Sequence, residues 1–269
     1  MERADGAYFT AEQAITVLDA LGWYISFACG RWTGPALTHG YDVTNKQVWQ
    51  IWDLHRTVSY KARLSWMDAC HREHFEVPFS RFFKLWQDEV SEQVIRLAIH
   101  WYIEANASAG SIEGAIVLTQ TAFEMLASFL LVEREGWIAA EPWDKLPAAD
   151  RIRLLFRWAG IPAVIPAELT ALVKLAKANE VFMLNKQPDT AAAMTTIRNT
   201  ITHPTRKNRE KFGTHPSEAR TETWNLGLWA LELCLLRMFD YNGTYACRLR
   251  HRWVGEVEHV PWSPKTQQY

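Results

Sequence analysis

The chain of 269 residues has few cysteines and almost no net charge, and each shortage excludes a class of protein. Its four cysteines are widely spaced and form no C-x-x-C pair, which argues against a disulfide framework or a zinc ribbon and fits a reducing compartment. The formal net charge is −1, so no general affinity for nucleic acid is expected. Any phosphate-binding surface must therefore be local.

Long uninterrupted apolar runs are also missing. The most apolar stretch, Gly114 to Val132, is broken by Gln120 and Glu124, so no segment approaches the roughly 18 uninterrupted apolar residues of a membrane span. The first residues, MERADGAYFTAEQ, carry acids where a signal peptide needs basic and then apolar residues. We therefore expect a cytoplasmic protein with no membrane partner.

The patterning predicts a mainly α protein with a small β appendage. Residues 1–88 are expected to form a small mixed α/β region, with a helix over Thr10–Phe27 and two short strands joined near Thr44–Lys46. Helical periodicity is expected to begin after Pro78, and residues 89–269 are expected to form an all-α domain. Its helices are predicted at 89–105, 111–135, after Pro147, from Pro166 to Ala178, at 190–203 and at 216–241.

One predicted helix ends in a group of residues suited to phosphodiester chemistry. Asp189 is a good N-cap, Pro204 cannot continue the helix, and Arg198, Asn199 and His203 lie on its last turns. A histidine transfers protons near neutral pH, and a guanidinium holds a phosphate and stabilises its charge. With a ribose 2′-hydroxyl as nucleophile, this chemistry needs no metal.

Context distinguishes this Arg–His pair from two others of similar spacing. Arg209 and His215 span Gly213 in what is predicted to be a charged loop, and Arg252 and His259 lie in an unpatterned tail. The competing interpretation of Arg198 and His203 is that two cations simply cover a helix C-terminus, where positive charge is favoured.

A second helix carries a polar stripe. Glu113, Gln120 and Glu124 share one face of an otherwise apolar helix, and Glu124 has the most apolar neighbours. A carboxylate in such surroundings needs a partner, so we expect Glu124 to orient His203 or Arg198. The alternatives are an ordinary solvated face, or pairing of Glu124 with a structural arginine such as Arg153 or Arg157.

Two basic runs follow the Arg–His helix. The first contains Arg206, Lys207, Arg209 and Lys211, and the second covers residues 248–252. Each is interpreted either as a solvated segment or as a grip on the RNA backbone with salt-sensitive binding. The first run, next to the motif, is the predicted RNA-binding segment.

No metal or cofactor site is predicted. Cys70–His74 places two histidines close in sequence, but no second ligand pair has matching spacing, so a solvated segment is favoured. Walker A, dinucleotide-binding, H-E-x-x-H and G-x-S-x-G motifs are missing from the sequence.

The segment Arg198–Pro204 (RNTITHP) resembles the R-N-x-x-x-H motif of HEPN ribonucleases. The resemblance extends to the helix IEGAIVLTQTAFEMLASFLLVERE, to Gly160-Ile161-Pro162, and to the ending YNGTY … VPW. Together these segments resemble the C-terminal HEPN domain of ApeA-like bacterial abortive-infection proteins over about residues 90–262. The resemblance is weaker over residues 20–60, which look like the end of that family's β-rich region.

The resemblance implies a HEPN-type helical bundle that dimerises, so that two R-x4-H helix ends share one cleft. It implies a metal-independent endoribonuclease, with tRNA as a common substrate, in an anti-phage or toxin system. Arg198 would bind the phosphate, His203 would be the general acid and base, and Asn199 would position one of them. Thr205 stands where adenylylated family members have tyrosine, so that control is not expected.

The chain is shorter than such family members, so a sensor partner or an antitoxin is an expected partner. Two alternatives come from other functional classes. One is a catalytically inactive HEPN-like module that binds RNA or a protein, and the other is a helical adaptor in which Arg198 and His203 only cap a helix.

Overall fold

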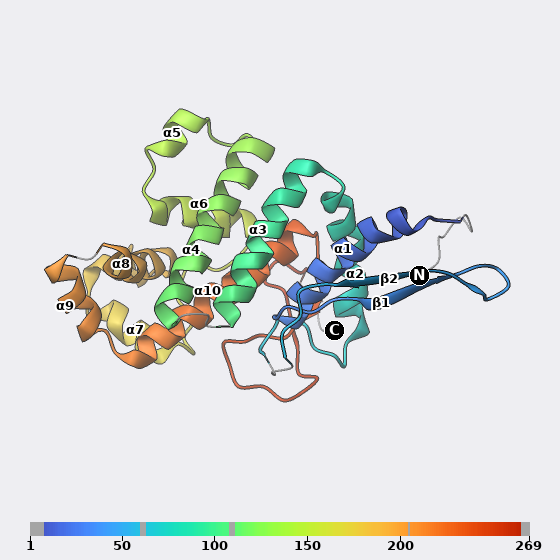
Figure 1. Cartoon of the computed structure of the whole chain (residues 1–269). Helices are drawn as coiled ribbons and strands as arrows, with labels where there is room; N and C mark the ends of the chain where they lie inside the picture. The colour runs from blue at the N-terminus through green and yellow to red at the C-terminus, as the bar shows by residue number, and fades with distance from the viewer. Residues whose placement is uncertain (1–7, 60–62, 108–110, 204, 265–269) are drawn as a thin grey trace.

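The computed structural model describes residues 8–59, 63–107, 111–203 and 205–264, and this part of the chain is mainly helical with small β-hairpins (Figure 1). The α-helices are α1 (Ala11–Cys29), α2 (Arg72–Trp86), α3 (Glu89–Asn106), α4 (Ile112–Ser128), α5 (Ala140–Asp144), α6 (Ala148–Ala159), α7 (Thr170–Lys177), α8 (Thr190–Thr202), α9 (Arg206–Thr214) and α10 (Ser217–Met238). A π-helical segment, η1 (Phe129–Arg134), extends α4, and η2 (Glu180–Phe182) is a 3-10 turn. The predicted mainly α fold with a β-hairpin appendage is confirmed, but residues 89–269 are not all-α, because this region also contains four short strands.

The strands form three separate antiparallel pairs. The longest pair is β1 (Ala36–Tyr41) with β2 (Gln47–Leu54), and the others are β3 (Met183–Leu184) with β4 (Gln187–Pro188) and β5 (Thr244–Tyr245) with β6 (Glu258–His259). The β1–β2 hairpin extends away from the bundle, at the end of the molecule opposite α8 and α9 (Figure 1). Its turn is closed by Asp42, whose side chain accepts the backbone N–H groups of Thr44 and Lys46.

Helix ends follow the sequence signals. Thr10 and Gln13 form a reciprocal capping box at the start of α1, and Asp88 and Ser111 cap α3 and α4. Gly160 ends α6 in the left-handed conformation, at φ 75°. Local hydrogen bonding therefore decides where these helices begin and end.

Helix α4 lies at the centre of the bundle and packs against α3, α6, α8 and α10. Gly227 allows α10 to approach closely, because a Cβ atom there would lie 2.9 Å from the hydroxyl of Thr119 on α4. Helix α10 has an apolar residue on nearly every face and is buried along most of its length. The core is continuous with the N-terminal region, where Phe27 of α1 and Phe82 of α2 both contact the ring of Phe239.

Several boundaries differ from the prediction. Helix α2 starts before Pro78 rather than after it. Proline lacks the N–H that would bond to the carbonyl of His74, and the buried hydroxyl of Tyr24 compensates by donating to the carbonyls of Phe75 (2.7 Å) and His74 (3.4 Å). The segment after residue 205, predicted as a charged loop, is helix α9, and α7 begins four residues after Pro166.

One described helical stretch, Ile112–Arg134, is long and apolar enough by composition to cross a membrane, contrary to the expectation from its two interrupting polar residues. In the structure 61% of its most apolar window is buried among the other helices. This burial is typical of the core helix of a soluble protein.

Candidate functional site

Helix α8 carries the predicted motif and is held firmly at its N-terminal end. Asp189 is 3% exposed, accepts the backbone N–H of Ala192 at 2.7 Å, and binds the guanidinium of Arg153 from α6 through Nε and Nη2 at 2.9–3.1 Å. A carboxylate at this end is also favoured by the helix dipole. The predicted N-cap is therefore confirmed, and the structure adds the arginine that fixes it.

At the other end of α8, Arg198 and Asn199 are in direct contact. Nη1 of Arg198 donates to the side-chain oxygen of Asn199 at 3.2 Å, and both residues are half-buried. Nε of Arg198 is buried and has no hydrogen-bond partner among the described residues. Asn199 thus orients one edge of the guanidinium and leaves other N–H groups for a ligand.

His203 is the exposed C-cap residue of α8. Its backbone N–H bonds to the carbonyl of Asn199 at 3.1 Å, and its own carbonyl accepts from Thr205 and from the side chain of Asn208. Pro204, predicted to end the helix, lies outside the described residues. The backbone of His203 is therefore fixed from both sides, while its imidazole faces solvent.

Glu124 does not make the predicted contact with the motif. The side-chain amide of Gln120 donates to its carboxylate at 2.8 Å, and within the described ranges Glu124 forms no ion pair with Arg198 or His203. The alternative partner Arg153 is bound to Asp189 and Asp150 instead. Gln120 and Glu124 lie one turn apart on the same face of α4. Gln120 is fully buried and needs a hydrogen-bond acceptor, which the half-exposed carboxylate of Glu124 supplies.

Glu113, the third member of the polar stripe, is half-buried and pairs with Arg220 of α10 at 3.3 Å. The stripe therefore serves two different purposes. Its first residue joins α4 to α10, and its other two residues bind each other.

The predicted RNA-binding run forms helix α9, which follows α8 directly. Arg206 is exposed and pairs with Glu210 one turn later at 2.8 Å. The side chains of Lys207, Arg209 and Lys211 lie outside the described part of the structure. Asn208, which sequence reasoning did not single out, joins the two helices by donating to the carbonyl of His203 at 2.9 Å.

The second basic run is not a free cationic surface. Arg248 is buried and bound to Glu232, Arg250 pairs with Glu258, and Arg252 pairs with Asp68 at 2.9 Å. Each arginine thus has a carboxylate from elsewhere in the fold. These ion pairs do not favour the interpretation of this run as an RNA-binding segment, and the burial of Arg248 does not fit a solvated segment.

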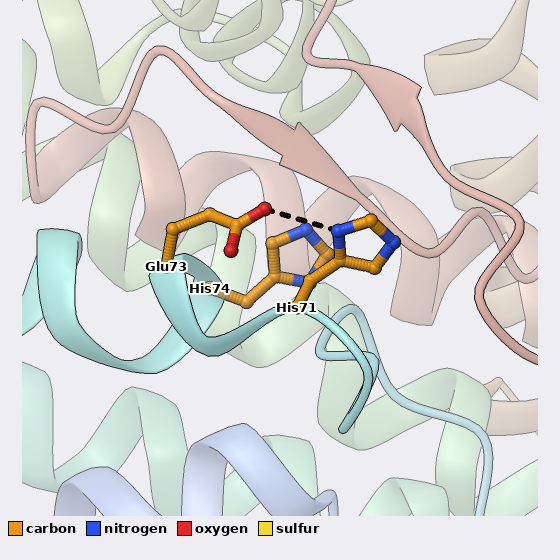
Figure 2. Close-up of side chains that lie close together, drawn as sticks. All are labelled: His71, Glu73 and His74. Atoms are coloured by element: carbon orange, nitrogen blue, oxygen red, sulfur yellow. Dashed lines mark hydrogen bonds and ion pairs between the residues drawn. The ribbon is translucent and has the colours of Figure 1, made fainter.

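His71, Glu73 and His74 lie together at the start of α2, with their candidate ligand atoms within 4.8 Å of one another (Figure 2). Nδ1 of His74 accepts the backbone N–H of Asp68, so its Nε2 carries the proton and donates to Thr244. Both nitrogens of His71 face acceptors, the carbonyl of Gly255 and the carboxylate of Glu73, each at 3.0 Å. All four ring nitrogens are engaged, so a metal ion would have to break existing hydrogen bonds.

The two histidines therefore differ in charge preference. Hydrogen bonding to Gly255 and then to Glu73 raises the pKa of His71, whereas burial, followed by repulsion from His71, lowers the pKa of His74. The segment was predicted to be solvated, but His74 is fully buried. Its hydrogen bonds join α2 to the C-terminal loop.

Comparison with known proteins gives two family matches that together cover most of the chain. Residues 88–259 match the YopA C-terminal domain, and residues 1–63 match the YopA central domain. The chain is 26% identical, over 267 residues, to the SPbeta prophage-derived uncharacterized protein YopA of Bacillus subtilis strain 168. That alignment covers 98% of this chain but 57% of the relative, and no solved structure matches significantly. The names of these families and of the relative state no activity, so the resemblance to HEPN ribonucleases stays a prediction.

Proposed function

The chain belongs to the YopA C-terminal domain family, and we propose that it is a metal-independent endoribonuclease of the HEPN type. The observation that carries the proposal is the end of α8, where Asn199 orients the guanidinium of Arg198 and His203 faces solvent at the helix C-cap. Helix α9 begins at Arg206, three residues after His203, and its sequence contains four basic residues.

The proposed roles follow from the chemistry of these groups. Arg198 binds the scissile phosphate and stabilises the charge that develops on its oxygens. His203 takes the proton of the ribose 2′-hydroxyl or returns a proton to the leaving 5′-oxygen. Asn199 is a positioning residue. Products with a 2′,3′-cyclic phosphate and a 5′-hydroxyl are expected.

The end of α8 supplies one arginine, Arg198, and one histidine, His203, for the chemical step. We propose that a homodimer places two α8 ends across a two-fold axis and so supplies a second proton-transfer group. A dimer has twice the mass of the 31.1 kDa chain, which light scattering distinguishes from a monomer. A monomer that still cleaves at nanomolar concentration contradicts this part of the proposal.

Its setting is proposed to be the bacterial cytoplasm, in an anti-phage or toxin-type system. The Bacillus subtilis relative is prophage-derived, which supports a bacterial setting linked to phages. Transfer RNA is the proposed substrate class, and an antitoxin or a sensor partner would restrain the activity.

Incubation of purified protein with a bacterial tRNA pool in EDTA tests the proposal. Discrete cleavage is expected from the native chain, and Arg198→Ala and His203→Ala should each abolish it while the unfolding midpoint stays near that of the native protein. Arg157→Ala and His251→Ala are matched controls, because both residues are exposed and lie outside α8. Strict dependence on magnesium would contradict the mechanism, and tRNA binding without cleavage would favour an inactive binding module.

A further inference from the structure

A cavity of about 510 Å³ lies between the end of α1, the segment that follows β2, and the last turns of α3. Three arginines line it: Arg31, Arg56 and Arg63. It joins residues from the part of the chain that matches the YopA central domain to residues from the part that matches the C-terminal domain. Ligand sites occur preferentially at such junctions, and the volume lies within the range of about 300–1,000 Å³ that is usual for small-molecule pockets.

The wall of this cavity is built around Trp32. The guanidinium of Arg56 lies 4.6 Å from the centre of the Trp32 ring, and the ring N–H donates to Glu104 of α3 at 2.8 Å. Glu104 also binds Nη2 of Arg56 at 2.9 Å, and the backbone N–H of Val58 donates to the carbonyl of Trp32. Arg56 is thus stacked and tethered, although its side chain is 57% exposed.

Positive charge is concentrated in the lining of this cavity. Among the described residues that line the cavity, three are arginines and one is a carboxylate, Glu104, which binds Arg56 and Trp32. The whole chain carries a formal charge of −1, so this concentration of positive charge is not a property of its average surface. Guanidinium groups bind phosphate and carboxylate oxygens in pairs of hydrogen bonds, which identifies an anion as the ligand.

The rest of the lining combines the hydroxyl groups of Thr57 and Ser59 with an apolar part, and the apolar part indicates the other half of the ligand. Val58, Ile103 and Ala107 contribute aliphatic surface, and the outer face of the stacked Arg56 guanidinium offers a plane for an aromatic ring. Inorganic phosphate would leave this surface and most of the volume unused. A planar ring joined to a phosphate matches both parts.

We propose that this cavity binds a phosphorylated organic anion of mononucleotide size, with the phosphate held by Arg31, Arg56 and Arg63 and the planar ring stacked on Arg56. The site lies on α1, α3 and the β2 end of the chain, whereas the proposed cleavage site lies on α8. The binding measurement requires no RNA cleavage, so the two proposals fail separately.

Isothermal titration calorimetry of the full chain with AMP, adenosine and inorganic phosphate tests the proposal. AMP should bind at least about tenfold more tightly than either fragment, since each fragment lacks one half of the contacts. Arg63→Ala should weaken AMP binding about tenfold or more through the loss of a charged hydrogen-bond donor. Arg56→Lys should weaken AMP binding while leaving phosphate binding nearly unchanged, because lysine keeps the charge and loses the plane.

Arg72→Ala is the matched control, because Arg72 is an exposed arginine of α2 that pairs with Glu76 away from the cavity. It should bind AMP as the native chain does. Three results would each overturn the proposal. They are no AMP binding to the folded native chain, equal affinity for AMP and inorganic phosphate, and unchanged AMP affinity in Arg63→Ala.

Discussion

Arg153 of α6 binds Asp189, and that contact sets the position of the helix that ends in the proposed ribonuclease motif. The guanidinium reaches the carboxylate through Nε and Nη2, while the same carboxylate caps α8 by accepting the N–H of Ala192. One buried side chain thus joins two helices and starts one of them. The orientation of α8 relative to the bundle depends on this junction.

Asp189→Ala should lower the free energy of unfolding by about 2–4 kcal/mol, because it removes a helix cap and leaves Arg153 without its more buried partner. Asp150→Ala removes the other, half-exposed partner of Arg153 and should cost less than about 1 kcal/mol. Urea unfolding of both variants measures the difference. Equal losses of unfolding free energy in the two variants would show that the cap and the buried contact contribute no more than the half-exposed pair.

Glu232→Ala should destabilise the fold severely, by about 3–5 kcal/mol, since it leaves the buried guanidinium of Arg248 without its carboxylate. Both side chains are almost completely inaccessible, and Tyr102 and Asn106 complete the network. Glu76→Ala is the comparison variant, because its pair with Arg72 is exposed and should contribute less than about 1 kcal/mol. Unfolding midpoints that fall equally in the two variants would contradict the assignment.

The His71–His74 pair should make stability depend on pH in two directions. The pKa of His71 is raised above 6.5, so its contribution is complete below that pH and is lost as the pH rises through its folded-state pKa. The pKa of His74 is lowered, so its contribution is present above 6.5 and is lost as the pH falls through its folded-state pKa.

His71→Gln should therefore flatten the decline in the unfolding midpoint on the alkaline side and leave the acidic side in place. Thermal unfolding followed by circular dichroism over about pH 5–9 measures both limbs, within the range where histidines titrate. His251→Gln, at an exposed site in the C-terminal loop, is the control. An alkaline limb that is the same in native protein and His71→Gln would rule out this role.

Asn199→Ala should reduce tRNA cleavage about tenfold with little change in stability, because the Arg198 guanidinium loses the acceptor that orients it. Asn199→Asp should retain the acceptor but reduce cleavage more, since its negative charge repels the substrate phosphate. Single-turnover rates of the two variants, together with their unfolding midpoints, test this positioning role. Cleavage by Asn199→Ala at the native rate would remove Asn199 from the site.

Local signals in the sequence were sufficient to predict most of the helices. Thr10, Asp88, Ser111 and Asp189 each have a side chain that caps the next helix within three residues, so neither tertiary contacts nor long-range pairing are needed to recognise them. The hairpin turn before Lys46 was recognisable for the same reason. These interactions join residues that are close in the chain.

Predictions from the sequence failed mainly where a residue's interaction partner lies far away in the chain. Pro78 was expected to precede its helix, because the compensating hydroxyl comes from Tyr24. The basic run at 248–252 looked like a surface because its carboxylate partners include Asp68 and Glu232. The assignment of Glu124 to the motif failed for a different reason, because its partner Gln120 lies only one helical turn away on the same face.

The sequence by itself determined the mainly helical fold, the hairpin, the cap that starts α8 and the order of Arg198, Asn199 and His203 along it. Each of these depends on side chains and backbone groups only a few residues apart. Tertiary structure alone decided which charges are neutralised and which surround an open cavity. Arg248 and Arg56 are both arginines in the same chain, but one is buried against Glu232 and the other lines a cavity, because packing sets the distance between charges that the sequence separates by many residues.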